Sequence, residues 1–176
     1  MATEVVVEAR KALSELARKL DARLITRGDD DSPYLWRGYL LGGDGDHEWN
    51  AFLHRFVGSD APGELHCHPF GESVSFILLG SYREIACEGT SLSDGRKLLG
   101  QPLTRDFMPG RKNVIKANTF HRVELITPEV WTLFIHGPRV QPWGFVKEGI
   151  YGAPVDMRVV HGKTSEARPK GVMVGT

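Results

Sequence analysis

Residues 64–80 read ELHCHPFGESVSFILLG, and this stretch decides how the rest of the chain is interpreted. It places two histidines, His66 and His68, one residue apart and follows them with Glu72 and an apolar run. Side chains two residues apart in a strand point to the same face, so the two imidazoles are predicted to project together. A proline and a glycine before Glu72 allow the chain to bend and bring the carboxylate to the same side. Two imidazoles and a carboxylate arranged in this way form most of a site for a divalent metal ion.

A further ligand has to come from another strand, and the best candidate lies in the run TFHRVELI at residues 119–126. Here His121 shares a face with Val123, which predicts that the imidazole points inward. The opposite face, which carries Phe120 and Arg122, is predicted to be solvated. An inward-facing histidine is also typical of a hydrogen-bonded core residue, so the residues alone leave both interpretations of His121 open.

The rest of the chain indicates the fold class. From Tyr34 onward, short runs rich in aromatic and β-branched residues alternate with turn-forming clusters about every ten residues, which is typical of an all-β sandwich or barrel. Before them, apolar residues with helical periodicity predict an N-terminal helix. With 176 residues, the chain is predicted to be one domain. We expect the helix within residues 1–27 to pack on a barrel at 28–150, and 151–176 to form a tail of the same domain.

The histidine stretch resembles the first sequence motif of the cupin family, which runs from a glycine through His-x-His to a glutamate and a second glycine. Three residues separate His68 from Glu72, as in the family, and seven separate Glu72 from Gly80, where the family has six. The second family motif is a Pro-x-Gly turn followed by a histidine and an asparagine. In this chain the Pro-Gly turn at 109–110 lies well before the histidine, and Leu125 stands where the asparagine would be.

The resemblance implies an all-β fold, the cupin double-stranded β-helix or jelly-roll barrel, with the N-terminal α-helix outside it. It also implies a metal ion inside the barrel, held by the residues that match His66, His68, Glu72 and His121. Such a nitrogen and oxygen donor set suits Fe(II), Mn(II), Ni(II), Cu(II) or Zn(II). Fe(II) is favoured because in cupins this arrangement commonly serves oxygenation.

The same resemblance favours an Fe(II)-dependent dioxygenase or oxygenase acting on a small organic molecule, because four protein ligands leave open positions on a five- or six-coordinate ion. Two alternatives stay open. One is a non-catalytic sensor cupin that binds a metal and a ligand. The other is a sugar isomerase or epimerase in which the ion acts as a Lewis acid.

Other polar residues are weaker candidates. His54 alternates with Phe52 along its run and is a candidate substrate contact, although the pattern favours a hydrogen-bonded core histidine. Arg139 follows a Gly-Pro turn and could hold a substrate carboxylate at the barrel rim, although bonds to carbonyls of the turn fit the pattern better. His136 ends the run WTLFIH and is predicted to be exposed. Cys67 is predicted to point away from the neighbouring histidines.

The composition of the chain indicates which kinds of binding partner to expect. The formal net charge is zero, so neither nucleic acid nor an anionic membrane is an expected partner. The N-terminal segment has no signal-peptide pattern and no apolar run is long enough to span a bilayer, so a cytoplasmic location is expected. Two cysteines are too few to indicate a disulfide framework. The expected partner is a small-molecule substrate, and a homodimer is expected by analogy with the family.

Overall fold

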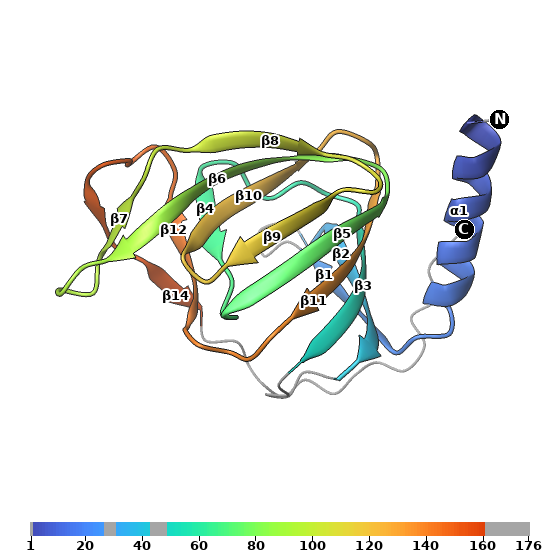
Figure 1. Cartoon of the computed structure of the whole chain (residues 1–176), viewed down its shortest axis with the longest axis horizontal. Helices are drawn as coiled ribbons and strands as arrows, with labels where there is room; N and C mark the ends of the chain where they lie inside the picture. Colours follow the sequence, from blue (N-terminus) through green and yellow to red (C-terminus); the bar gives the residue numbers. More distant parts are fainter. Residues whose placement is uncertain (1, 27–30, 43–48, 161–176) are drawn as a thin grey trace.

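The computed structural model describes residues 2–26, 31–42 and 49–160. In these parts the chain forms one α-helix and fourteen β-strands, and the strands build two antiparallel sheets that curl around a shared interior (Figure 1). The first sheet has the order β1 (Ala22–Thr26), β2 (Pro33–Leu41), β3 (Asn50–Phe56), β11 (Val130–His136), β5 (Glu72–Leu79) and β9 (Lys112–Lys116).

The second sheet has the order β13 (Pro154–Val155), β7 (Lys97–Leu99), β6 (Tyr82–Ser91), β10 (Thr119–Leu125), β4 (Glu64–Cys67), β12 (Trp143–Lys147) and β14 (Arg158–Val160). The strand β8 (Leu103–Phe107) pairs with β6 outside this order. Consecutive strands alternate between the two sheets from β4 to β6 and again from β9 to β12. Strands that are far apart in the sequence therefore become neighbours within one sheet. The prediction of an all-β jelly-roll barrel with an N-terminal helix is confirmed.

Strand alternation sets the inside and the outside of the barrel. In β5 every second residue from Ser73 to Ile77 is buried, whereas Glu72 and Phe76 are exposed. The inner faces of the two sheets meet in apolar clusters; one of them joins Ile77 and Val130 of the first sheet to residues of the second sheet. This alternation is the period of two that a strand buried on one face requires.

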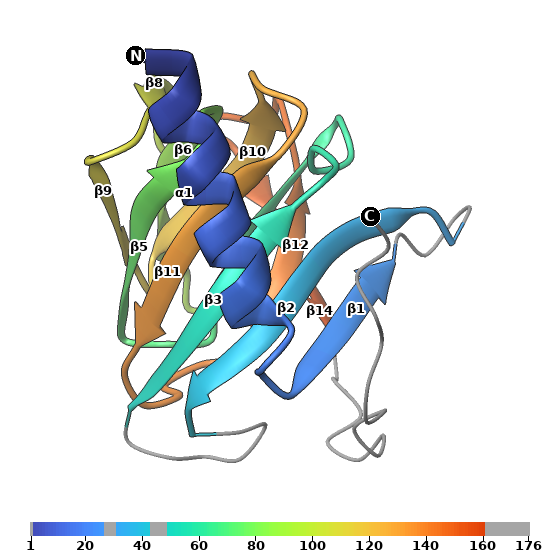
Figure 2. The ribbon, with the colours of Figure 1, turned by 90° about the vertical axis from the view of Figure 1, so that its right-hand side faces the viewer.

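The helix α1 (Ala2–Ala17) lies across the outer face of the first sheet, over β3 and β11 (Figure 2). Its Ala17 packs in a buried cluster with Trp36 and Trp131, which point outward from the sheet. Glu129 strengthens this contact, because its carboxylate is 2.6 Å from Arg10 Nε of the helix and 2.7 Å from Arg55 Nε of the sheet.

The helical periodicity of the N-terminal segment extends further than the helix itself. The helix ends at Ala17, and residues 22–26 form β1, which pairs with β2. Each residue from Ala22 to Ile25 has a register partner in β2, and tertiary pairing of this kind overrides local helical preference. Leu24, which lies in β1, is 40% exposed.

A second buried cluster covers the outer face of the second sheet and corrects the prediction for β10. Phe120 is 1% exposed and packs with Leu65, Cys67 and Val155, so this part of the face predicted to be solvated is covered. The covering residues come from 151–157, within the predicted tail; residues 161–176 lie outside the described residues. Within the described parts of the chain, no helix is long and apolar enough to cross a membrane.

Candidate metal centre

Three histidines converge inside the barrel. His66 lies in β4, His68 follows that strand directly, and His121 lies in the neighbouring β10, where it is the register partner of His66. One ring nitrogen of each side chain lies within 4.8 Å of those of the other two. The ring centroids are 4.6 to 5.2 Å apart. The alternation of β4 and its pairing with β10 are therefore sufficient to bring the three imidazoles together.

A carboxylate is hydrogen-bonded to the His121 imidazole, and a second carboxylate lies near His66 beyond hydrogen-bond distance. His121 Nδ1 lies 2.6 Å from Glu84 Oε1 of β6, and Asn113 Nδ2 donates to the same oxygen over 2.6 Å. His66 Nδ1 lies 3.8 Å from Asp60 Oδ2, which accepts the backbone N–H of Val123 at 2.6 Å. A carboxylate bound to Nδ1 fixes the orientation of the ring and leaves Nε2 as the donor atom, which is the arrangement usual around metal-bound histidines.

The spacing of the nitrogens fits a common metal ion. His68 Nε2 and His121 Nε2 lie 2.9 Å apart. Two imidazole nitrogens that bind one divalent ion at about 2.0–2.1 Å, at right angles to each other, lie about 2.9 Å apart. Two lone pairs at this distance need a proton or a cation between them, so the donor chemistry of the site and its geometry both suit a divalent ion.

Burial keeps the donors in the protonation states that metal binding needs. It lowers the pKa of His66 to about 4, against an opposing effect of Asp60. Burial also lowers the pKa of His68 well below its ordinary value, and the neighbouring His121 and His66 add to the effect. Burial alone would raise the pKa of Glu84, but its hydrogen bonds with His121 and Asn113 outweigh burial and bring the pKa below the ordinary value. Neutral imidazoles at His66 and His68 and an ionised carboxylate at Glu84 are thus expected at neutral pH.

Glu72, predicted as the carboxylate ligand, is not brought into this group. It is the first residue of β5 and its side chain is exposed, because strand alternation turns Ser73 and Ser75 inward and Glu72 outward. The bend at the preceding proline and glycine does not bring it round to the histidines; the carboxylate of Glu84, from a different strand, approaches them instead.

Of the other residues considered from the sequence, some lie in the barrel interior and some on the surface. His54 is 4% exposed and faces the interior, where its ring stacks at 5.2 Å on Phe134. Arg139 is exposed on the surface, at an isolated backbone bridge to Phe70. The prediction that His136 is exposed is wrong, because it is 5% exposed and stacks on Phe70 at 3.4 Å. The strand end on which it lies is covered by the segment that carries Phe70.

Several residues of the site were not predicted from the sequence. Glu84 shares the inner face of β6 with Tyr82, and the alternation in YREIAC contains this signal, but no motif marks the strand. Asp60 precedes β4 in a loop, so only the fold brings it to His66. Arg37 lies opposite His54 in β2 and donates from Nε to His54 Nε2 over 3.2 Å. Its position depends on a strand register that the sequence does not determine.

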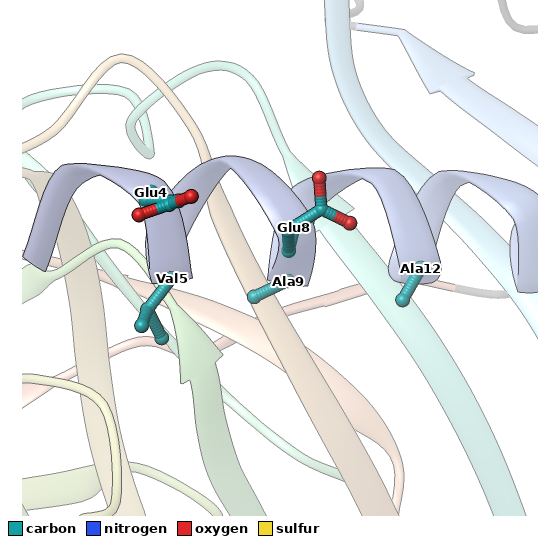
Figure 3. Close-up of a pocket in the computed structure, with 5 residues that line it drawn as sticks. All are labelled: Glu4, Val5, Glu8, Ala9 and Ala12. Carbon is teal, nitrogen blue, oxygen red and sulfur yellow. The ribbon is translucent and has the colours of Figure 1, made fainter. Parts of the chain in front are cut away.

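A separate hollow lies on the outside of the molecule, under the first half of α1. Figure 3 shows its lining, which consists of Val5, Ala9 and Ala12 with Glu4 and Glu8. It contains no histidine or cysteine, and its two carboxylates belong to one exposed helix. It therefore has none of the imidazole nitrogen donors found in the barrel.

Comparison with known proteins adds distant structural resemblances. Neither a family model nor a curated protein matches the sequence. Among solved structures, the hydroxypropylphosphonic acid epoxidase from S. wedmorenis matches with a TM-score of 0.46 and 10% identity, over 66% of this chain and 55% of that one. KdgF from Halomonas sp. matches with a TM-score of 0.42 and 18% identity, over 60% of this chain and 80% of that one. Oxalate decarboxylase from Lactobacillus farciminis matches with a TM-score of 0.43 and 15% identity, over 70% of this chain and 32% of that one. The chain thus spans about half the length of the epoxidase.

The sheets and the site together define the class of protein. Two antiparallel sheets with jelly-roll connections enclose three histidines at the positions that the His-x-His motif and a later strand predict. The chain has a cupin fold, and its interior holds a candidate site for a divalent metal ion.

Proposed function

We propose that this protein is a mononuclear Fe(II) oxygenase that acts on a small organic molecule inside the barrel. The observation that carries the proposal is the convergence of three histidine nitrogens in a buried interior, where burial lowers the pKa of both His66 and His68. Three protein donors leave several positions open on a five- or six-coordinate ion, as catalytic sites require and closed structural sites do not. An Fe(II) ion bound there would supply the redox chemistry by which dioxygen and an organic substrate react.

The residues of the chain have separate tasks in this proposal. His66, His68 and His121 hold the ion. Glu84 keeps the proton of His121 on Nδ1 and so directs the Nε2 lone pair into the site. The carboxylate of Asp60 lies 3.8 Å from His66 Nδ1 and is anchored by the backbone N–H of Val123.

Aromatic side chains form the wall next to the histidines. The ring of Phe134 lies 5.6 Å from that of His68, and Phe70 lies 6.4 Å from it in a stacked orientation. Phe134 also stacks on Phe52, at 6.4 Å. These rings exclude water from the ion and offer an apolar surface to the organic part of a substrate, as is usual for small-molecule sites.

The test is oxygen uptake by protein loaded anaerobically with Fe(II), screened against small organic acids, phenols and thiols. We expect at least one compound to cause uptake that depends on iron and is lost in His66→Ala. If no compound causes uptake while several raise the melting temperature of the loaded protein, the oxygenase proposal is wrong and a non-catalytic binding protein is the better description.

A further inference from the structure

A row of polar side chains crosses the inner face of the first sheet, opposite the histidines of the metal centre. Arg37 of β2 is the register partner of His54 of β3, and His54 is the register partner of Thr132 of β11. Register partners in neighbouring strands point to the same face, so the three side chains lie side by side and face the barrel interior. Core positions of this kind are usually apolar, so their polarity needs a reason.

Contacts on both sides determine the position of the arginine. Arg37 Nε donates to His54 Nε2 over 3.2 Å, and the guanidinium lies over the ring of Phe52 at 5.0 Å. Because Nε2 of His54 accepts this bond, the hydrogen of the neutral imidazole is on Nδ1. Burial and the charge of Arg37 lower the pKa of His54 well below its ordinary value, which keeps the ring neutral. The guanidinium, with five N–H donors, is thereby held in one plane.

The buried hydroxyl of Thr132 is a second indication that a polar ligand binds at this row. Thr132 is 0% exposed, and among the described residues its Oγ1 has no hydrogen-bond partner. A buried hydroxyl without a partner destabilises the fold, and a valine of the same shape would avoid this cost. A hydroxyl retained in the barrel next to His54 and Arg37 points to a polar group that occupies this place when a ligand is bound.

This row lies within reach of the metal centre. The ring of Phe134 is 5.2 Å from His54 on one side and 5.6 Å from His68 on the other. The ring of Phe134 thus connects the row with the histidine group.

We propose that Arg37, His54 and Thr132 bind the carboxylate of the small-molecule substrate, with the rest of the molecule directed along Phe134 toward His68. A planar carboxylate matches the donor geometry of a guanidinium. The positive charge of Arg37 favours an anion, and a phosphonate or phosphate dianion carries more charge into a buried site than a carboxylate monoanion does. That the bound carboxylate belongs to a substrate rests on the oxygenase proposal. The binding of a carboxylate by these three residues does not depend on that proposal.

The test measures the binding of three probes to metal-free protein by calorimetry: benzoate, the neutral benzamide of nearly the same shape, and phenylphosphonate. The variants are Arg37→Met and Thr132→Val, with Arg111→Met as the control, because Arg111 is an exposed arginine outside the barrel interior. We expect benzoate to bind at least about tenfold more tightly than benzamide, since a charge-assisted bidentate bond is lost in the amide. Arg37→Met should weaken benzoate about tenfold or more and Thr132→Val a few-fold, whereas Arg111→Met should leave it unchanged.

Thr132→Val keeps the test decisive if Arg37→Met does not fold, because it removes an unpartnered hydroxyl at constant shape and should fold at least as stably as the wild type. A hydroxyl with only a structural role would change stability without changing benzoate affinity. Undetectable benzoate binding by the wild type, equal binding of benzamide, or unchanged affinity in the variants would each overturn the proposal. Tighter binding of phenylphosphonate than of benzoate would overturn the carboxylate assignment. Oxygen uptake plays no part in these measurements, so failure of the oxygenase proposal is detected separately.

Discussion

His121 Nδ1 and Glu84 Oε1 lie 2.6 Å apart, and each of the two side chains is only 3% exposed. Such a buried pair fixes both the tautomer and the direction of the imidazole. The histidine belongs to β10 and the glutamate to β6, which are adjacent strands, so the fold itself supplies the carboxylate behind the proposed ligand.

Glu84→Gln should therefore weaken metal binding without removing a metal ligand. We expect the affinity for Zn(II), measured by competition with a chromogenic chelator, to fall about 10- to 100-fold, because the ring loses its charged orienting partner. Glu88→Gln is the matched control, since Glu88 lies on the same strand with its side chain exposed. Equal affinity of Glu84→Gln and the wild type would show that the pair is structural only.

Glu72→Ala should leave metal content close to that of the wild type. Its carboxylate is exposed at the start of β5, on the face opposite the buried serines. We expect the stoichiometry, measured by mass spectrometry after dialysis, to change by less than about a fifth, because an outward-facing side chain makes little contribution to a buried site. Loss of the ion in this variant would restore Glu72 as a ligand and would require the strand to begin differently in the metal-bound protein.

Stability of the metal-free protein should fall as the pH falls below about 6.5, the ordinary pKa of histidine. The pKa of His66 is about 4 in the folded state, chiefly because the ring is buried. Between these two pH values the unfolded chain binds a proton that the folded protein does not, so unfolding is favoured increasingly toward the acid side. His66 alone contributes roughly 3 kcal/mol to the loss when the pH has fallen to 4.

Urea unfolding in the presence of EDTA, at several pH values between 5 and 8, measures this effect. Above pH 7 the free energy of unfolding should be nearly independent of these histidines. The variant His66→Gln should show a shallower dependence between pH 6.5 and 5 than the wild type. Identical slopes for the two proteins would mean that His66 is protonated in the folded state as readily as in the unfolded chain.

Glu129→Gln should loosen the attachment of the helix to the barrel. The carboxylate is 8% exposed and contacts Arg10 of α1 and Arg55 of β3. We expect a loss of about 1–2 kcal/mol, mostly from the Arg55 contact, because Arg10 is half exposed and solvent screens its charge. Denaturant unfolding and the rate of proteolysis within residues 2–17 measure it. Glu15→Gln, an exposed change on the same helix, should have no effect; an equal effect of both variants would contradict the role of Glu129.

Strand alternation, a local property, was sufficient to predict an all-β domain, the shared face of His66 and His68 and the inward position of His121. The jelly-roll barrel and the place of His121 beside the other two histidines were predicted from the resemblance to cupins. His66 and His68 share a face through their spacing, and His121 has an apolar neighbour at the same parity. Glu72 was misplaced because a proline and a glycine permit a bend without determining its direction. The outcome depended on where β5 begins, which is set by its pairing with β9 and β11.

The carboxylates and the arginine of the interior could not be predicted in the same way. Glu84 reaches His121 only through the β6–β10 register, and Arg37 reaches His54 only through the β2–β3 register. Such registers arise from tertiary packing, and a shift of one residue would turn each side chain to the opposite face. The burial of Phe120 likewise depends on residues more than thirty positions away, including Val155.

The measurement that tests the metal centre most directly is the metal content of untagged protein, with His66→Ala and His121→Ala as variants and Glu88→Gln as the control. Mass spectrometry should find about one equivalent of a divalent ion, iron if the oxygenase proposal holds, in the wild type and the control. Both histidine variants should lose it while remaining folded, because each removes one of only three converging donors. A folded wild-type protein without metal after reconstitution, or histidine variants that keep the full equivalent, would contradict the account.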